Sequence, residues 1–343
     1  MITITQRRFL PNKLKVTSWE VLAPYFTQLT ERSITSKTDL EEWLKDRSEL
    51  EAFVSEDLAW RYVKMTCNTE DKSLEEAYLF FVNEIEPQIS PLTDQLNRKL
   101  IESPFIKELD HDKYFIYLRG IQKEIEIFRE ANVPLMAEIA TESQKYGSIV
   151  GSMTVELDGK ELTLQQAANF LEVPDRSKRE EVYRKILSRR LQDRDKLDNL
   201  FNELVKLRHR IALNAGFSNY RDYMFANLGR FDYTADDCFK FHHAVEKFLV
   251  PLVQKNEEMH RANIGVDVLR PWDLNAEPEG QKPLRPYDGS ADLINKTIAC
   301  FNEMDPFLGA CIEALKNENR LDLESRKGKA PGGYNYPLYE TGM

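Results

Sequence analysis

The sequence feature that most constrains the fold is a stripe of apolar residues at helical spacing near the N-terminus. It consists of Leu40, Trp43, Leu44, Leu50, Phe53, Val54, Leu58, Tyr62 and Met65. A second, shorter stripe runs from Leu74 to Ile85 and stops before Pro87, a residue type that interrupts helices. A helix with one apolar face is stable only when that face is buried against a partner. The N-terminal part of the chain is therefore predicted to be a lobe of packed helices.

Helix-start patterns and composition support this prediction. Three hydroxyl residues are each followed three positions later by glutamate, the pattern of a capping box, in Thr17…Glu20, Thr38…Glu41 and Ser73…Glu76. Further periodic segments lie at about 91–102, 112–130 and 134–146. Glycine is scarce, with 14 in 343 residues, while charged residues make up 30% of the chain. This composition favours helices.

One strong strand signal interrupts the helical pattern. Residues 153–157 and 160–164 both alternate apolar and polar side chains, and Asp158-Gly159 lies between them. An Asp-Gly pair suits a tight hairpin turn because both of its positions require positive φ. We therefore predict a β-hairpin over about 152–164.

The second half of the sequence is also predicted to be helical. A long charged helix should run from Asp175 to about Asn214, with Gly216 just beyond its end as a stop signal. The segments predicted after it are, in chain order, a helix after Ser218, a helix from about Thr234 to Gly265, a proline-rich irregular excursion over 266–289, and helices at about 290–304 and 306–318. The predicted fold class is mainly α with one β-hairpin.

Charge and hydropathy exclude several functions and locations. The formal net charge of −10 disfavours nucleic acid and anionic lipid as partners. The longest apolar runs, such as 248–253, are too short to span a membrane. Residues 1–16 lack the apolar core of a secretory signal, which favours the cytoplasm. The cysteines Cys67, Cys238, Cys300 and Cys311 are scattered, so no disulfide framework is predicted.

The residues alone indicate no active site. The chain contains no His-Glu-x-x-His sequence, no Gly-x-Ser-x-Gly elbow and no phosphate-binding loop. Cys238 and His242 are four residues apart on a predicted helix, which is a spacing found in metal sites. The neighbouring Phe239 and Phe241 favour ordinary packing instead. One alternative is a carboxylate-bridged di-iron protein, because two Glu-x-x-His units occur, formed by Glu108, His111, Glu257 and His260. Against it, both units lie near predicted helix ends, where charged side chains commonly interact with the helix dipole.

Several segments together resemble the oligoendopeptidase F branch of the thimet-oligopeptidase-like zinc metallopeptidases. In chain order these are 43–67, the hairpin at 151–164, Asp175-Arg176 with Arg179, residues 208–220, Leu269-Arg270-Pro271-Trp272-Asp273-Leu274, and Gly328-Lys329 followed by Pro331-Gly332-Gly333-Tyr334. The resemblance extends over nearly the whole chain.

The resemblance implies a mainly helical peptidase that hydrolyses short peptides inside a closed channel. In the family, His-Glu-x-x-His and a more distant glutamate hold zinc, and the motif glutamate acts as general base. The motif follows the segment that resembles 328–334, where this sequence ends, so no catalytic or metal residue carries over. We expect residues 1–174 to form a helical N-terminal lobe and 175–343 the first, incomplete part of the zinc-peptidase domain.

Gly332, Gly333 and Tyr334 are the predicted substrate-binding residues. They resemble the family's extended stretch beside the cleft, where small residues would let a peptide backbone approach as an added strand. The alternative is a plain Gly-Gly turn before a structural strand. Residues 321–341 read as an extended segment that needs a partner, so the sequence is expected to be truncated and inactive alone. It could then act as a peptide-holding half with a separate catalytic half, or associate with itself.

Overall fold

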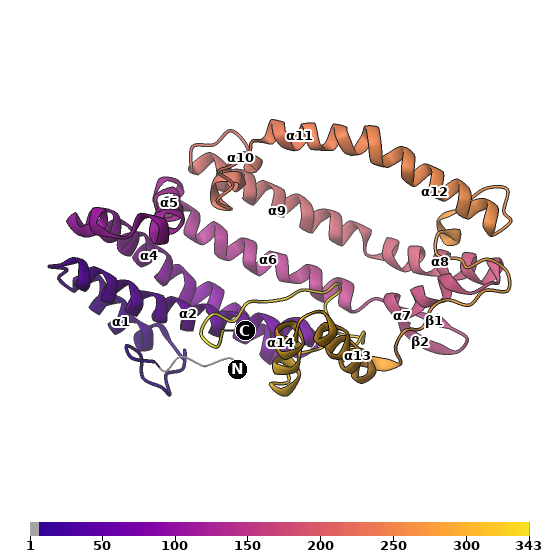
Figure 1. Ribbon diagram of the computed structural model, residues 1–343, viewed down its shortest axis with the longest axis horizontal. Coiled ribbons are helices and arrows are strands. Elements are labelled where there is room, and N and C mark those ends of the chain that lie inside the picture. Colours follow the sequence, from indigo (N-terminus) through magenta and orange to yellow (C-terminus); the bar gives the residue numbers. More distant parts are fainter. Residues whose placement is uncertain (1–6, 343) are drawn as a thin grey trace. The chain divides into compact units, whose positions relative to one another are not determined.

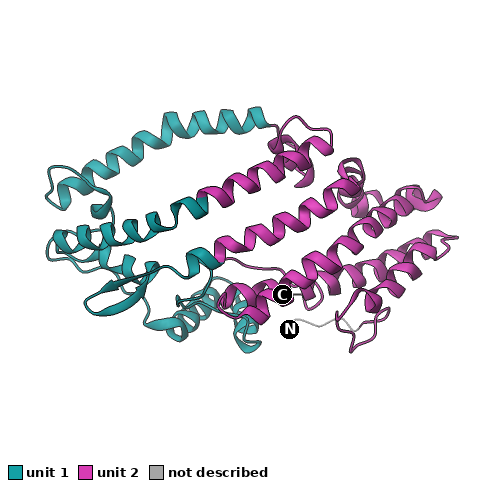
Figure 2. Ribbon diagram, turned by 180° about the vertical axis from the view of Figure 1, so that it is seen from behind, with its two compact units in different colours: residues 1–2, 148–197, 235–331 teal, residues 3–147, 198–234, 332–343 magenta. Residues whose placement is uncertain are grey.

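The computed structural model describes residues 7–342 and confirms a mainly α fold (Figure 1). The chain divides into two compact units, shown in Figure 2. Unit 1 contains residues 148–197 and 235–331, and unit 2 contains 3–147, 198–234 and 332–343. The predicted domain boundary between 174 and 175 stays a prediction. In the described residues, no helix is both long enough and apolar enough to cross a membrane.

Unit 2 is built from helices whose apolar stripes face one another. The helices that lie wholly within it are α1 (Trp19–Glu31), α2 (Lys37–Cys67), α3 (Lys72–Phe80), α4 (Glu86–Ile101), α5 (His111–Ile127) and α10 (Tyr220–Asn227), with short turns η1 (Phe81–Ile85), η2 (Pro104–Glu108) and η3 (Glu130–Asn132). Two further helices, α6 (Val133–Gly151) and α9 (Arg194–Asn214), have residues in both units.

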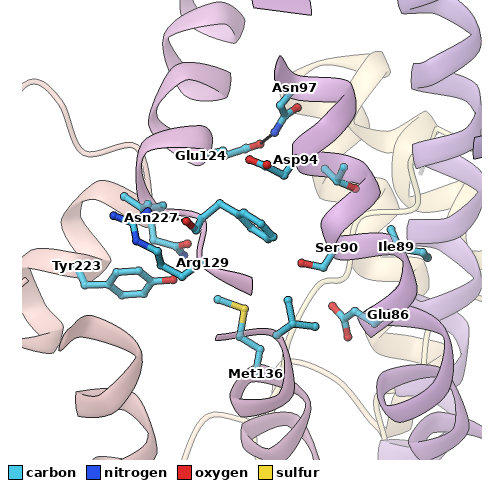
Figure 3. Close-up of a pocket in the computed structure, with 14 residues that line it drawn as sticks. Glu86, Ile89, Ser90, Asp94, Asn97, Glu124, Arg129, Met136, Tyr223 and Asn227 are labelled. Carbon is cyan, nitrogen blue, oxygen red and sulfur yellow. Dashed lines mark hydrogen bonds between the residues drawn. The ribbon is translucent and has the colours of Figure 1, made fainter. Parts of the chain in front are cut away.

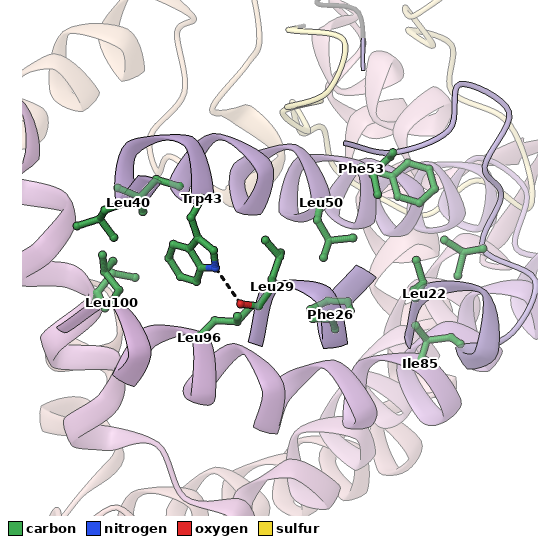
Figure 4. Packing of buried hydrophobic residues seen from close by; sticks show 14 of the residues in the cluster. Leu22, Phe26, Leu29, Leu40, Trp43, Leu50, Phe53, Ile85, Leu96 and Leu100 are labelled. Atoms are coloured by element: carbon green, nitrogen blue, oxygen red, sulfur yellow. Dashed lines mark hydrogen bonds between the residues drawn. The ribbon is translucent and has the colours of Figure 1, made fainter. Parts of the chain in front are cut away.

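The predicted stripe on α2 forms the centre of this core (Figure 4). Trp43 is fully buried, and its indole Nε1 donates to the carbonyl oxygen of Leu29 on α1 at 2.9 Å. Around it pack Leu22, Phe26, Leu40, Leu50, Leu96 and Leu100, each at most 1% exposed. Burying a large aromatic ring while satisfying its one polar atom makes Trp43 a strong anchor between α1 and α2.

The predicted helix starts are correct to within two residues, but the predicted capping residues are wrong. The residues that take the cap positions of α1, α2 and α3 are Ser18, Ser36 and Asp71 instead of Thr17, Thr38 and Ser73. Ser36 and Asp71 accept backbone N–H groups through their side chains, whereas Ser18 does not. Each start offers more than one polar side chain, and only the residue with extended backbone just before the helix can serve as the cap.

The predicted helix end before Pro87 is also wrong, because the helix continues through the proline. The π-helical turn η1 joins α3 to α4, and Pro87 follows it by two residues. A second π-helical turn, η5 (Val245–Leu249), precedes Pro251 in the same way. A π turn shifts the hydrogen-bond register from i−4 to i−5. This shift lets each helix accommodate a residue that has no N–H.

The charged helix predicted from Asp175 to Asn214 is two helices, α8 (Arg176–Gln192) and α9. Asp193 separates them with φ −105° and ψ 11°, and its carboxylate accepts hydrogen bonds from Arg189 at 2.6 Å and Lys196 at 2.7 Å. Asp favours caps and turns because its short side chain can bond to groups close by in the chain. The predicted stop is confirmed, since α9 ends at Asn214 and Gly216 has φ +88°.

Unit 1 contains the predicted hairpin, which is confirmed. Strands β1 (Thr154–Leu157) and β2 (Lys160–Thr163) pair antiparallel, with Val155 opposite Leu162. Asp158 and Gly159 form the turn with φ of 52° and 74°. The buried face of the hairpin packs against α7 (Leu164–Ala168), η4 (Asn169–Glu172) and α8.

The rest of unit 1 follows the predicted order. It contains α11 (Ala235–Ala244), η5, α12 (Val250–Asn263), α13 (Gly289–Met304) and α14 (Pro306–Asn317). The excursion over 266–289 is irregular except for the short turn η6 (Pro271–Asp273). Its Asp273 is fully buried and pairs with Arg176 and Arg179 of α8, so this irregular segment is fixed by charge as well as packing.

Candidate functional site

Three tyrosines and a threonine form an aromatic cluster in unit 2, which we call the tyrosine cluster: Tyr62, Thr66, Tyr334 and Tyr336. Tyr62 and Thr66 are four residues apart on α2, so their side chains share one face of that helix. The Tyr62 ring centroid lies 5.6 Å from that of Tyr334 and 5.7 Å from that of Tyr336. The Tyr334 hydroxyl lies 2.5 Å from Thr66 Oγ1. The chain's last described segment is thus attached to α2.

The residues after the tyrosines continue along α2. Leu338 is buried, and Glu340 pairs with Arg7. The backbone N–H of Thr341 donates to Glu56 Oε2 at 2.9 Å, and Glu56 is itself only 6% exposed. The predicted extended segment therefore finds a partner in α2, through the buried carboxylate of Glu56, and a second one in Arg7.

The predicted site residues Gly332, Gly333 and Tyr334 lie at the start of this segment. Gly332 has φ +89°, a conformation that favours glycine. A Cβ atom added at either glycine would meet no other atom within 4 Å, and both glycines are exposed. Tyr334 is 52% exposed while its hydroxyl contacts Thr66. The three residues border open space on one side and the tyrosine cluster on the other.

Sequence reasoning missed Tyr62, Thr66 and Tyr336 as neighbours of these residues. Helical periodicity assigns Tyr62 only to the apolar stripe of a helix, whereas in the structure its ring also contacts that of Tyr78, with centroids 5.9 Å apart. The available signal was the two-residue spacing of Tyr334 and Tyr336, which places both rings on one side of an extended segment.

The hydroxyl groups of Tyr78 and Tyr336 stay protonated at physiological pH. Burial, and to a lesser degree the negative charge of Glu86, raises the pKa of Tyr78 to about 12. Burial also raises the pKa of Tyr336, with Tyr62 and Glu86 as lesser causes. Uncharged phenols bind by ring contacts and hydrogen bonds, so the cluster has the chemistry of a binding surface.

The described residues do not fit a zinc or di-iron centre. Between residues 7 and 342, no three His, Cys, Asp or Glu side chains are placed to hold a metal ion. His111 stacks on Phe115 at 5.0 Å in an exposed position, and His260 Nε2 lies 2.9 Å from the carbonyl oxygen of Asp273. These local contacts account for both histidines, so the structure gives the di-iron alternative no geometric support.

Comparison with family models identifies the chain's relatives. The model of the peptidase M3 N-terminal domain matches residues 9–128, and the model of peptidase family M3 matches residues 169–295. Together they span more than half of the chain. The chain belongs to peptidase family M3. Residues 332–334 lie outside both matched ranges of this M3 chain.

Solved structures extend the match to nearly the whole M3 chain. PZ peptidase A with an inhibitor has a TM-score of 0.88 and 27% identity over 96% of this chain. A protein assigned as oligoendopeptidase F, in a structure at 3.1 Å, has a TM-score of 0.87 and 26% identity over 95% of this chain. A Bacillus anthracis protein, also assigned as oligoendopeptidase F, has the same fold, with a TM-score of 0.88 and 23% identity over 95% of this chain.

The M3 chain corresponds to the N-terminal portion of an oligoendopeptidase F-like protein. It spans 59% of the PZ peptidase A chain, 58% of the second structure and 60% of the Bacillus anthracis protein. No curated protein matches the sequence.

Proposed function

We propose that this M3 chain supplies the peptide-binding wall of an oligoendopeptidase F-like zinc metallopeptidase that hydrolyses short peptides. The observation that carries the proposal is the TM-score of 0.88 with PZ peptidase A over 96% of this chain. Residues outside these 343 then supply the zinc site, because the sequence contains no His-Glu-x-x-His and the described residues form no metal-holding cluster. When bound in such enzymes, zinc lowers the pKa of a water ligand to about 7.

The backbone at Gly332 and Gly333 supports the peptide-binding role. Neither glycine makes a backbone hydrogen bond within the described chain, and no atom lies where a Cβ would stand. Unpaired N–H and C=O groups on an exposed extended segment can pair with the backbone of an extended peptide. Such pairing does not depend on side chains, which suits an enzyme that accepts peptides of varied sequence.

The tyrosine cluster supports the same role from the other side of the segment. The Tyr334–Thr66 and Thr341–Glu56 hydrogen bonds fix the segment on α2, so its open edge is presented in a defined geometry. A pre-ordered edge loses less conformational freedom when a peptide binds than a mobile loop would. The half-exposed ring of Tyr334 offers apolar contact area to a peptide side chain.

The test is peptide binding by the chain and by its Gly333→Val variant, measured by fluorescence anisotropy with a labelled octapeptide. Valine adds bulk beside the segment, and its Cβ atom would have no atom of the fold within 4 Å. We expect the Kd to rise about tenfold or more, a loss of about 1.4 kcal/mol, with an unchanged melting temperature.

Gly120→Val is the matched control, because Gly120 also has no atom within 4 Å of an added Cβ and lies on α5, away from the segment. Its peptide affinity should equal that of the parent chain. Equal affinities for the Gly333→Val variant and the parent, or no octapeptide binding by the parent, would refute the proposed peptide-binding wall.

A further inference from the structure

Unit 2 contains a pocket of about 290 Å³ that the proposed peptide-binding wall does not use (Figure 3). Helix α4 forms one wall, the C-terminal end of α5 and the start of α6 form another, and Tyr223 and Asn227 of α10 complete it. Pockets for drug-sized ligands typically occupy about 300–1,000 Å³. This pocket therefore suits a small ligand.

One side of the pocket carries a carboxylate without a partner. The side chain of Glu86, the first residue of α4, makes no hydrogen bond or ion pair with any described residue. The surrounding protein raises the pKa of Glu86 by desolvation, although the side chain keeps contact with solvent. The other two carboxylates in the lining are occupied: Asp94 pairs with Arg98 at 2.7 Å, and Glu124 accepts from Asn97 Nδ2 at 3.0 Å.

The opposite side carries a guanidinium without a carboxylate partner. Arg129 donates to the carbonyl oxygens of Phe128 at 2.6 Å, Glu126 at 2.9 Å and Ala215 at 3.4 Å. Figure 3 shows Arg129 beside Tyr223 and Asn227, across the pocket from Glu86. Neutral carbonyl groups hold this guanidinium in place, and among residues 7–342 no carboxylate is its counter-ion.

Apolar side chains also line the pocket. Ile127, Phe128, Val133 and Met136 belong to its lining. A simple cation would leave Arg129 without a counter-ion, and a simple anion would be repelled by Glu86. A ligand that carries both charges, separated by an apolar body, can pair with Glu86 and with Arg129 and can cover the apolar lining.

We propose that this pocket binds a small zwitterionic ligand, a free dipeptide, with its ammonium group at Glu86 and its carboxylate at Arg129. Arginine pairs well with carboxylates because its planar fork can donate two parallel hydrogen bonds. This inference does not depend on the proposed peptide-binding wall, since it rests on a separate set of residues.

The test is isothermal titration of the full chain with leucyl-leucine, its N-acetyl derivative and its C-terminal amide. Each derivative removes one of the two ligand charges. We expect leucyl-leucine to bind, and the Kd to rise at least tenfold for either derivative. No binding of leucyl-leucine at millimolar concentrations, or equal binding of all three dipeptides, would overturn the inference.

Two variants test which charge of the ligand pairs with Glu86 and which pairs with Arg129. Glu86→Gln should weaken binding of leucyl-leucine about as much as N-acetylation does, and Arg129→Gln about as much as amidation does. Glu84→Gln is the matched control, because Glu84 is exposed two residues from Glu86 and does not line the pocket. Glu86→Gln removes charge at nearly constant shape, so it decides the test even if Arg129→Gln unfolds.

The Gly333→Val variant separates the two sites. It should bind leucyl-leucine with the same affinity as the parent chain while its octapeptide affinity falls. If Gly333→Val also abolishes leucyl-leucine binding, the dipeptide occupies the extended segment and the pocket assignment is wrong.

Discussion

Replacing Asp273 with alanine is expected to lower the free energy of unfolding by about 3–5 kcal/mol. Asp273 is fully buried and accepts from Arg176 Nη2 at 2.8 Å, Arg179 Nη2 at 3.0 Å and the backbone N–H of Arg270 at 3.0 Å. Arg179 is itself only 3% exposed. Removing the carboxylate leaves the buried guanidinium of Arg179 without a counter-ion and detaches the irregular segment 266–289 from α8. Urea denaturation measures the resulting loss in the free energy of unfolding.

Asp322→Ala is the control for this prediction. Asp322 pairs with Arg326 at 2.7 Å and with Lys329 at 2.9 Å, but its side chain is 33% exposed. Solvent-exposed ion pairs contribute about 0–1 kcal/mol. The free energy of unfolding of this variant should therefore be close to that of the parent chain. An Asp273→Ala variant no less stable than Asp322→Ala would show that the buried cluster does not fix the excursion.

The pH dependence of the Asp273→Ala effect follows from the pKa of the carboxyl group. Burial by itself would raise the pKa of Asp273, but hydrogen bonds from Arg176 and Arg179 outweigh it and lower the pKa below its ordinary value. A depressed folded-state pKa contributes stability above the unfolded pKa of about 3.9. The difference between parent and variant should therefore be constant near neutral pH and shrink as the pH falls below about 4.

The helices and the hairpin could be predicted from the sequence because their signals are local. The stripe on α2 and the Asp158-Gly159 turn each depend on residues within one element, and both are confirmed. Helix boundaries that depend on competition between neighbouring groups for the same backbone hydrogen bonds could not be predicted. The break at Asp193 and the continuation of the helix through Pro87 both result from such competition.

The candidate sites were harder to predict because they join distant parts of the chain. Thr66 and Tyr334 share a hydrogen bond across 268 positions of sequence. Periodicity on α2 showed that Tyr62 lies on an apolar face, but it did not show what covers that face. The pocket likewise combines Glu86 and Arg129 from different elements. Each is an ordinary charged residue in the sequence, and only the fold shows that neither has an ionic partner among the residues that the structure describes.

After the loss of stability expected for Asp273→Ala, the second prediction with a large expected effect concerns catalysis. The 343-residue protein by itself is expected to bind no stoichiometric zinc and to leave peptides uncleaved. Catalytic zinc sites use three protein ligands and an open position for water, and residues 7–342 contain no such cluster. Without a metal ion, water keeps a pKa near 15.7 and is a poor nucleophile at neutral pH. Enzymes accelerate reactions by about 10⁶-fold or more, so the expected loss relative to a complete M3 peptidase is very large.

The most direct test of the account combines metal analysis with peptide turnover on the purified chain. Zinc content is measured after dialysis against buffer with zinc, and cleavage of a quenched fluorescent octapeptide is followed with and without chelator. A complete M3 peptidase serves as the positive control. The account predicts substoichiometric zinc and background cleavage, together with octapeptide binding that Gly333→Val weakens. One zinc per chain with chelator-sensitive cleavage would contradict it.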